Sequence, residues 1–142
     1  IECSPSSLNK TGFVKSEIVG GNLSILYSLL GSKSDIKTDN KILFIEDLDE
    51  YLYHVDRMII SLKRAGKFNN IKAMIVGSMT KMHDNKIKFG MNAKEIIKYH
   101  TKEFNFPVCF NFPAGHQKNN RPVILGKVSK LDINSNLVCL SQ

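Results

Sequence analysis

The stretch Lys41-Ile-Leu-Phe-Ile-Glu46 decides the fold class of this sequence. Four consecutive apolar residues between polar neighbours are typical of a short strand buried on both faces. We expect this strand to stop abruptly at Glu46, so that residues 46–50 form an acidic loop. A second apolar run, residues 71–76, predicts another buried strand that ends at Gly77. Two buried strands separated by a helix-length segment indicate a mixed α/β fold.

The segment between these strands carries the clearest helical pattern, predicted over residues 53–65. Apolar side chains recur there at spacings of three and four residues, which places them on one buried stripe. The members of the stripe are Leu52, Val55, Met58, Ile59, Leu62 and Ala65. Gly66 follows as a C-terminal stop, because glycine adopts the left-handed conformation at little cost.

The remaining elements follow from similar patterns. They are a strand over 13–19, a helix over 23–30 capped by Asn22 and ended by Gly31, a helix over 93–104, a strand over 107–110, and a hairpin of strands 123–131 and 137–140. No internal repeat or linker divides the chain, so we expect residues 1–142 to form one domain.

Composition narrows the class of protein. Hydrophobic residues make up 42% of the 142 residues and charged residues 23%, which is ordinary for a globular domain. No apolar run approaches the roughly 18 residues of a membrane span, and the polar start shows no signal peptide. We therefore expect no membrane partner. Because the sequence begins without methionine, we expect its natural start to lie upstream.

The formal charge of +7 reflects 20 Lys and Arg against 13 Asp and Glu. The lysines are scattered, with no basic run interleaved with aromatic residues, so a solvated basic surface is favoured over a nucleic-acid site. The three cysteines form no C-x-x-C pair and are odd in number, which disfavours disulfides and zinc and suits a reducing compartment. Cys109 and Cys139 are predicted to be small buried strand residues.

The first place where chemistry is expected is Gly20-Gly21-Asn22, at a predicted junction of strand and helix. Glycines permit close approach, and a helix start offers free N–H groups. The segment matches neither phosphate-binding fingerprint, G-x-x-x-x-G-K-[ST] or G-x-G-x-x-G. A plain tight turn is the competing interpretation.

The second place is Glu46, followed closely by Asp47, Asp49 and Glu50. A carboxylate after a buried strand is well placed in a cleft, because α/β folds build sites at the carboxyl ends of strands. Four carboxylates also raise the possibility of a hard metal site, although the spacing is not that of an EF-hand. The alternative is an acidic segment that favours the dipole of the helix after it.

The third place is the turn Pro113-Ala-Gly-His116. Its histidine follows residues with restricted backbone angles, which suits a ring aimed in one direction. The other histidines lie on predicted helices (His54, His100) or in a polar loop (His83). A purely structural turn histidine is the alternative.

Five motifs in one order carry a resemblance to a known family. They are Gly20-Gly21-Asn22-Leu23-Ser24, Ile42-Leu-Phe-Ile-Glu46-Asp47, the Asp56-Arg57 helix, Ile75-Val-Gly-Ser-Met-Thr80 and Pro113-Ala-Gly-His116. This order resembles the C-terminal domain of the LD-carboxypeptidases, a serine peptidase family that includes the microcin C self-immunity proteins. The resemblance runs from Gly20 to the C-terminus. It implies a compact layered domain of the swivelling β/β/α type, with mixed strands and two or three helices.

The resemblance also implies roles for residues. Glu46 is expected to be the acid that orients a general base, His116, while Gly20, Gly21, Asn22 and Gly115 shape the site or bind substrate. The family's nucleophilic serine and oxyanion hole belong to an N-terminal domain that residues 1–142 do not include. We interpret Ser24 and Ser78 as non-nucleophilic, expect no metal or cofactor, and expect this chain alone to be inactive.

The implied activity is removal of the terminal D-alanine from a tetrapeptide muropeptide at an L-to-D bond, in the cytoplasm, during peptidoglycan recycling. The implied partners are the muropeptide and the N-terminal domain, and family members are often homodimers. Two alternatives remain open: a microcin-immunity hydrolase of peptidyl or aminoacyl adenylates, and a non-catalytic basic binding module.

Overall fold

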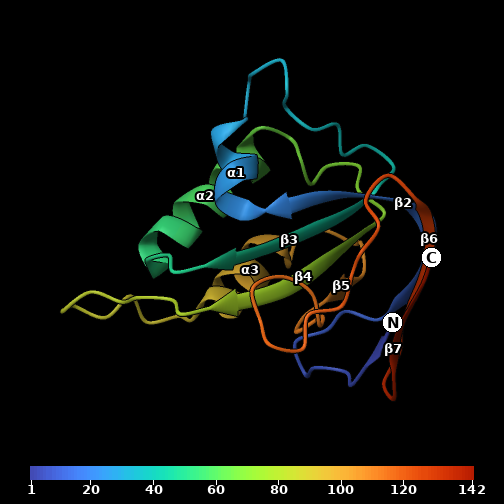
Figure 1. Cartoon of the computed structure of the whole chain (residues 1–142). Coiled ribbons are helices and arrows are strands. Elements are labelled where there is room, and N and C mark those ends of the chain that lie inside the picture. Colours follow the sequence, from blue (N-terminus) through green and yellow to red (C-terminus); the bar gives the residue numbers. More distant parts are fainter.

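The computed structural model describes all residues from Ile1 to Gln142 and contains three helices and one seven-stranded mixed sheet (Figure 1). The strand order across the sheet is β1-β7-β6-β2-β3-β4-β5. The elements in chain order are β1 (Glu2–Cys3), β2 (Gly12–Asn22), α1 (Leu23–Ser28), β3 (Ile42–Leu48), α2 (Leu52–Arg64), β4 (Ala73–Thr80), α3 (Ala93–Thr101), β5 (Val108–Cys109), β6 (Val128–Ile133) and β7 (Val138–Ser141).

Strand β2 joins two halves of the sheet. Its residues 12–17 pair antiparallel with β6, and its residues 18–22 pair parallel with β3. The parallel half continues through β4 to β5, and the antiparallel half continues through β7 to β1. Figure 1 shows both chain ends beside β6 and β7, where the amino group of Ile1 donates to the carbonyl of Leu140 (2.6 Å).

Two hydrophobic clusters give the domain its layers. The first lies between the helices and one face of the parallel strands, and includes Leu43, Ile45, Met74 and Val76. The second joins the opposite face of those strands to β6 and β7. Alternate residues of β3 and β4 enter different clusters because successive side chains in a strand point to opposite faces. The arrangement is a layered α/β domain, as expected.

Helix α2 buries the predicted stripe. Val55, Met58 and Ile59 are fully buried, and Leu62 is 1% exposed. Leu52 is only half-buried and Ala65 is exposed, because these residues lie at the two ends of the helix. None of the three helices is long and apolar enough to cross a membrane.

Several predicted boundaries are wrong. The acidic loop does not begin at Glu46, since β3 continues through Asp47 to Leu48, and β4 continues past Gly77 to Thr80. Gly20 and Gly21 lie inside β2. The helix predicted to reach residue 104 ends at Thr101. The end of β3 was misplaced because the polar side chains of Glu46 and Asp47 find partners far away in the sequence.

The C-terminal hairpin is confirmed, but its first strand begins at Val128 instead of residue 123. Gly126 has a φ of +81°, which interrupts extended backbone before β6. Cys109 is fully buried as predicted. Cys139 is only half-buried, because Val138 and Leu140 occupy the inward face of β7.

Candidate functional site

Glu46 and His116 meet although they lie 70 residues apart, with Nδ1 of the imidazole 2.8 Å from Oε2 of the carboxylate. The backbone N–H of His116 donates to the same oxygen (3.1 Å). An ionised carboxylate can only accept, so Nδ1 carries the proton of a neutral ring and Nε2 keeps a lone pair. Nε2 has no hydrogen-bond partner in the chain, and the His116 side chain is 53% exposed while that of Glu46 is 7% exposed.

Two glycines allow the His116 turn to approach Glu46. Gly115 has a φ of +107°, and a Cβ there would lie 2.6 Å from Oε2 of Glu46 and 2.5 Å from Oγ of Ser78. A Cβ on Gly77 would lie 2.5 Å from the carbonyl oxygen of Ala114. Both positions therefore exclude side chains, because real Cβ atoms do not come so near to other heavy atoms.

The turn is also tied to β4 by hydrogen bonds. The backbone N–H of Ser78 donates to the carbonyl of Ala114 (2.9 Å), and Oγ1 of Thr80 donates to the carbonyl of His116 (2.9 Å). Figure 1 shows this segment, in orange, running past β4. The carboxyl ends of β3 and β4 thus hold Glu46 and the His116 turn together.

Asn22 connects Glu46 to a second carboxylate, Asp47. Its Nδ2 donates to Oδ1 of Asp47 (2.9 Å) and lies 3.4 Å from Oε1 of Glu46. Its Oδ1 accepts the N–H of Ile25 (3.2 Å), which confirms Asn22 as the cap of α1. Oδ2 of Asp47 accepts the N–H of Ser24 (3.0 Å).

Asp47 is 2% exposed. Burial raises its pKa above the ordinary value, and the hydrogen bonds donated by Leu48, Asn22 and Ser24 act in the opposite direction. A buried carboxylate with this many donors is a fixed part of the site's framework. Asp47 was not among the predicted site residues. The sequence signal for it is a pair of polar residues near the ends of two neighbouring strands, Asn22 in β2 and Asp47 in β3.

The predicted glycines have different roles. Gly20 pairs with Phe44, and a Cβ on Gly20 would overlap the Phe44 carbonyl, so this residue permits close pairing of β2 with β3. A Cβ on Gly21 would meet nothing within 4 Å. The tight-turn interpretation is wrong for both, since they lie within a strand.

The remaining acidic residues diverge from Glu46. Asp49 pairs with His83 (Oδ1 to Nε2, 2.6 Å) and Glu50 pairs with His54 (Oε2 to Nδ1, 2.6 Å). The first turn of α2 contains no acidic residue, and Glu50 directly precedes its N-cap, Tyr51. No group of three or more His, Cys, Asp and Glu side chains is arranged to hold a metal ion.

Neither Ser24 nor Ser78 forms a hydrogen bond with the His116 ring. Oγ of Ser24 donates to Oδ1 of Asn22 (2.6 Å). Oγ of Ser78 is buried and has no hydrogen-bond partner. Neither hydroxyl is therefore a hydrogen-bond partner of Nε2 of His116.

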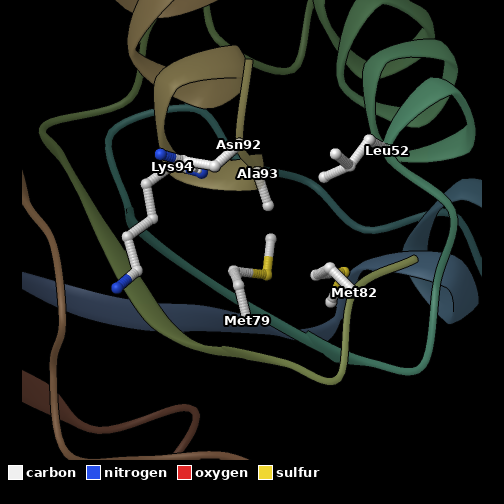
Figure 2. A pocket seen from close by; sticks show the side chains of 6 residues that line it. All are labelled: Leu52, Met79, Met82, Asn92, Ala93 and Lys94. Atoms are coloured by element: carbon white, nitrogen blue, oxygen red, sulfur yellow. Dashed lines mark hydrogen bonds between the residues drawn. The ribbon is translucent and has the colours of Figure 1, made fainter. Parts of the chain in front are cut away.

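Two hollows flank the carboxyl ends of β3 and β4. One is an open depression of about 760 Å³ that contains His116; its lining residues are Leu48, Thr80, Lys81, His116, Gln117 and Lys118. Figure 2 shows the other, a pocket of about 300 Å³ into which Met79, Met82 and Leu52 project. Met79 packs against the helix-side cluster, so this pocket lies on the face of the sheet away from His116.

Comparisons with known proteins bear on this geometry. The family described as LD-carboxypeptidase C-terminal domain matches residues 15–131. A probable murein peptide carboxypeptidase of Bacillus subtilis is 33% identical over 125 residues, which are 88% of this chain and 39% of the relative. A murein tetrapeptide carboxypeptidase of Pseudomonas aeruginosa is 25% identical over 122 residues, 85% of this chain and 39% of the relative.

Solved structures share the fold. A muramoyltetrapeptide carboxypeptidase from Oxalobacter formigenes superposes with a TM-score of 0.88 at 24% identity, covering 99% of this chain and 48% of the other. The microcin C7 self immunity protein MccF gives a TM-score of 0.82 at 24% identity, covering 94% of this chain and 40% of the other. The chain spans about two fifths of the length of the curated relatives described above.

Proposed function

Since the chain belongs to the LD-carboxypeptidase family, we propose that Glu46 and His116 are the acid and the base of a serine-type carboxypeptidase. The observation that carries this proposal is the 2.8 Å contact between Oε2 of Glu46 and Nδ1 of His116. A buried carboxylate on one ring nitrogen and an open lone pair on the other is the arrangement of a base awaiting a hydroxyl.

The proposed chemistry uses each nitrogen of His116 for a different task. Nε2 takes the proton of a serine hydroxyl, which is a poor nucleophile until a base removes that proton. Glu46 fixes the tautomer and stabilises the imidazolium that results. The imidazolium then returns the proton to the leaving amine, so that the peptide bond breaks and an acyl-enzyme forms for water to hydrolyse.

The nucleophile is proposed to come from a domain outside residues 1–142. The engaged hydroxyl of Ser24 and the buried hydroxyl of Ser78 support this proposal, as does the 39% share that the chain covers of its relatives. The chain by itself is then expected to hydrolyse nothing, because it holds the base without the group to be activated.

The proposed substrate is a muropeptide tetrapeptide that loses its terminal D-alanine at an L-to-D bond, in the cytoplasm, during peptidoglycan recycling. The names of the relatives from B. subtilis and P. aeruginosa, murein peptide and murein tetrapeptide carboxypeptidase, support this substrate class. No metal or organic cofactor takes part in the proposed reaction.

The test uses the full-length protein and a tetrapeptide ending in D-alanine, with released D-alanine as the readout. His116→Ala is expected to lower kcat by about 10⁴-fold or more, as loss of a triad base does in other serine peptidases. Glu46→Gln is expected to lower it by about 10³- to 10⁴-fold, because the amide favours the wrong tautomer.

His83→Ala is the matched control, because His83 also pairs with a carboxylate, that of Asp49, at 2.6 Å. It should retain near-normal turnover. Near-normal turnover by His116→Ala would contradict the proposal. A peptidyl adenylate analogue is assayed in parallel. Cleavage of this analogue without cleavage of the tetrapeptide would assign the protein to the immunity-type hydrolases.

A further inference from the structure

We propose that Lys81 and Lys118 form a binding subsite for the free α-carboxylate of the substrate's terminal residue. This inference rests on the proposed function and names the group that distinguishes a carboxypeptidase substrate from an internal peptide bond. Both lysines line the open depression that contains His116, and no acidic residue lines it.

The fold brings the two lysines to His116 from different segments. Lys81 directly follows β4, and Lys118 lies two residues after His116. The hydrogen bond from Oγ1 of Thr80 to the carbonyl of His116 (2.9 Å) joins these segments beside the depression. Both lysines therefore border the same open space as His116.

Neither ammonium group is neutralised within the chain. The lysines that form ion pairs are Lys41, Lys63 and Lys67. Asp49, which follows Leu48 of the lining directly in the chain, pairs with His83 at 2.6 Å. Two unpaired cations beside an open hollow create a local positive potential that favours an anionic ligand.

The backbone of Lys81 supplies an independent observation. Its φ is +52°, in the left-handed region that side-chain-bearing residues other than Asn, Asp and His seldom adopt. Such conformations cost about 1–3 kcal/mol and cluster at ligand-binding positions. Lys81 therefore has a backbone conformation that few lysines adopt, at the end of β4 that borders the depression.

The chemistry of the leaving group places the carboxylate near these lysines. Nε2 of His116 must come within about 3 Å of the leaving amine to protonate it. In an α-amino acid the carboxylate carbon lies about 2.5 Å from the amine nitrogen, since only the Cα separates them. The carboxylate of the departing D-alanine therefore lies within about 6 Å of Nε2. The depression bordered by Lys81 and Lys118 is an open space beside this ring.

The experiment compares two peptides in the full-length protein: a tetrapeptide ending in D-alanine and the same peptide ending in D-alaninamide. The double variant Lys81→Gln/Lys118→Gln is expected to raise KM for the free acid at least tenfold, because charge-assisted hydrogen bonds are lost. Its kcat for the free acid and its activity on the amide should change little. Lys81→Arg/Lys118→Arg, which keeps both charges, should retain most of the preference for the free acid.

Lys72→Gln is the matched control, since Lys72 is an exposed lysine at the opposite end of β4. It should leave KM for the free acid unchanged. An unchanged KM in the Gln double variant would overturn the subsite while leaving the proposed carboxypeptidase activity standing. Failure of the wild-type protein to cleave either peptide would overturn both proposals.

Discussion

Replacing Gly115 by alanine tests how closely the His116 turn must approach Glu46. The new methyl group would lie 2.6 Å from Oε2 of Glu46, 2.5 Å from Oγ of Ser78 and 2.9 Å from Cβ of Glu46. Overpacking of this kind costs about 1–3 kcal/mol, and a φ of +107° adds backbone strain of about 1–3 kcal/mol for alanine. We expect a total loss of about 2–6 kcal/mol.

The assay is urea unfolding of the full-length protein, combined with kcat on the tetrapeptide. Gly90→Ala is the control, because Gly90 has a φ of +88° and a Cβ there would meet nothing within 4 Å. Gly90→Ala reports the backbone cost alone, so Gly115→Ala should be less stable than it. Gly115→Ala should also lose turnover, since the methyl group separates the carboxylate from the ring. Equal stability of the two variants together with normal turnover would refute this reasoning.

Three further predictions concern the framework of the site and the core. Burial raises the pKa of Asp47 above its ordinary 3.8. Between pH 3.8 and this raised pKa, the folded protein therefore retains a proton that the unfolded chain releases. Stability should therefore fall as pH rises through that window, and Asp47→Asn should remove this part of the slope in urea unfolding at a series of pH values. Gly20→Ala should lower the free energy of unfolding by about 3 kcal/mol or more, because its methyl group overlaps the Phe44 carbonyl, whereas Gly21→Ala should cost clearly less. The pKa of Cys109 is raised, first by its contact with Cys3 and then by burial, so mass spectrometry should find Cys109 alkylated at pH 8 only after unfolding.

The parts of the fold that were predicted correctly rest on local patterns. The apolar run before Glu46 lies in β3, and Val55 to Leu62 form the buried face of α2. Such patterns predict an element well because the spacing of its buried residues follows directly from the geometry of a strand or helix. The sequence could not show where β3 ends, because Glu46 and Asp47 look like loop residues until their distant partners are known.

The site was predicted unevenly for the same reason. The resemblance singled out Glu46 and His116, and the structure brings these two side chains into contact. Their catalytic roles remain a prediction. The contact between Asp47 and the start of α1 had no local signal, since it depends on β2 and β3 lying side by side with Asn22 opposite Glu46.

Adjacent carboxylates in β3 serve two different layers. Glu46 faces the turn that carries His116, whereas Asp47 faces the start of α1 and accepts the N–H of Ser24. Successive residues of a strand point to opposite faces, so these two carboxylates lie on different sides of the sheet. Asn22 bridges them, with Nδ2 near both carboxylates and Oδ1 capping α1. The start of α1 is therefore fixed relative to Glu46, and a shift of that helix would reach the candidate base through two hydrogen-bonded side chains.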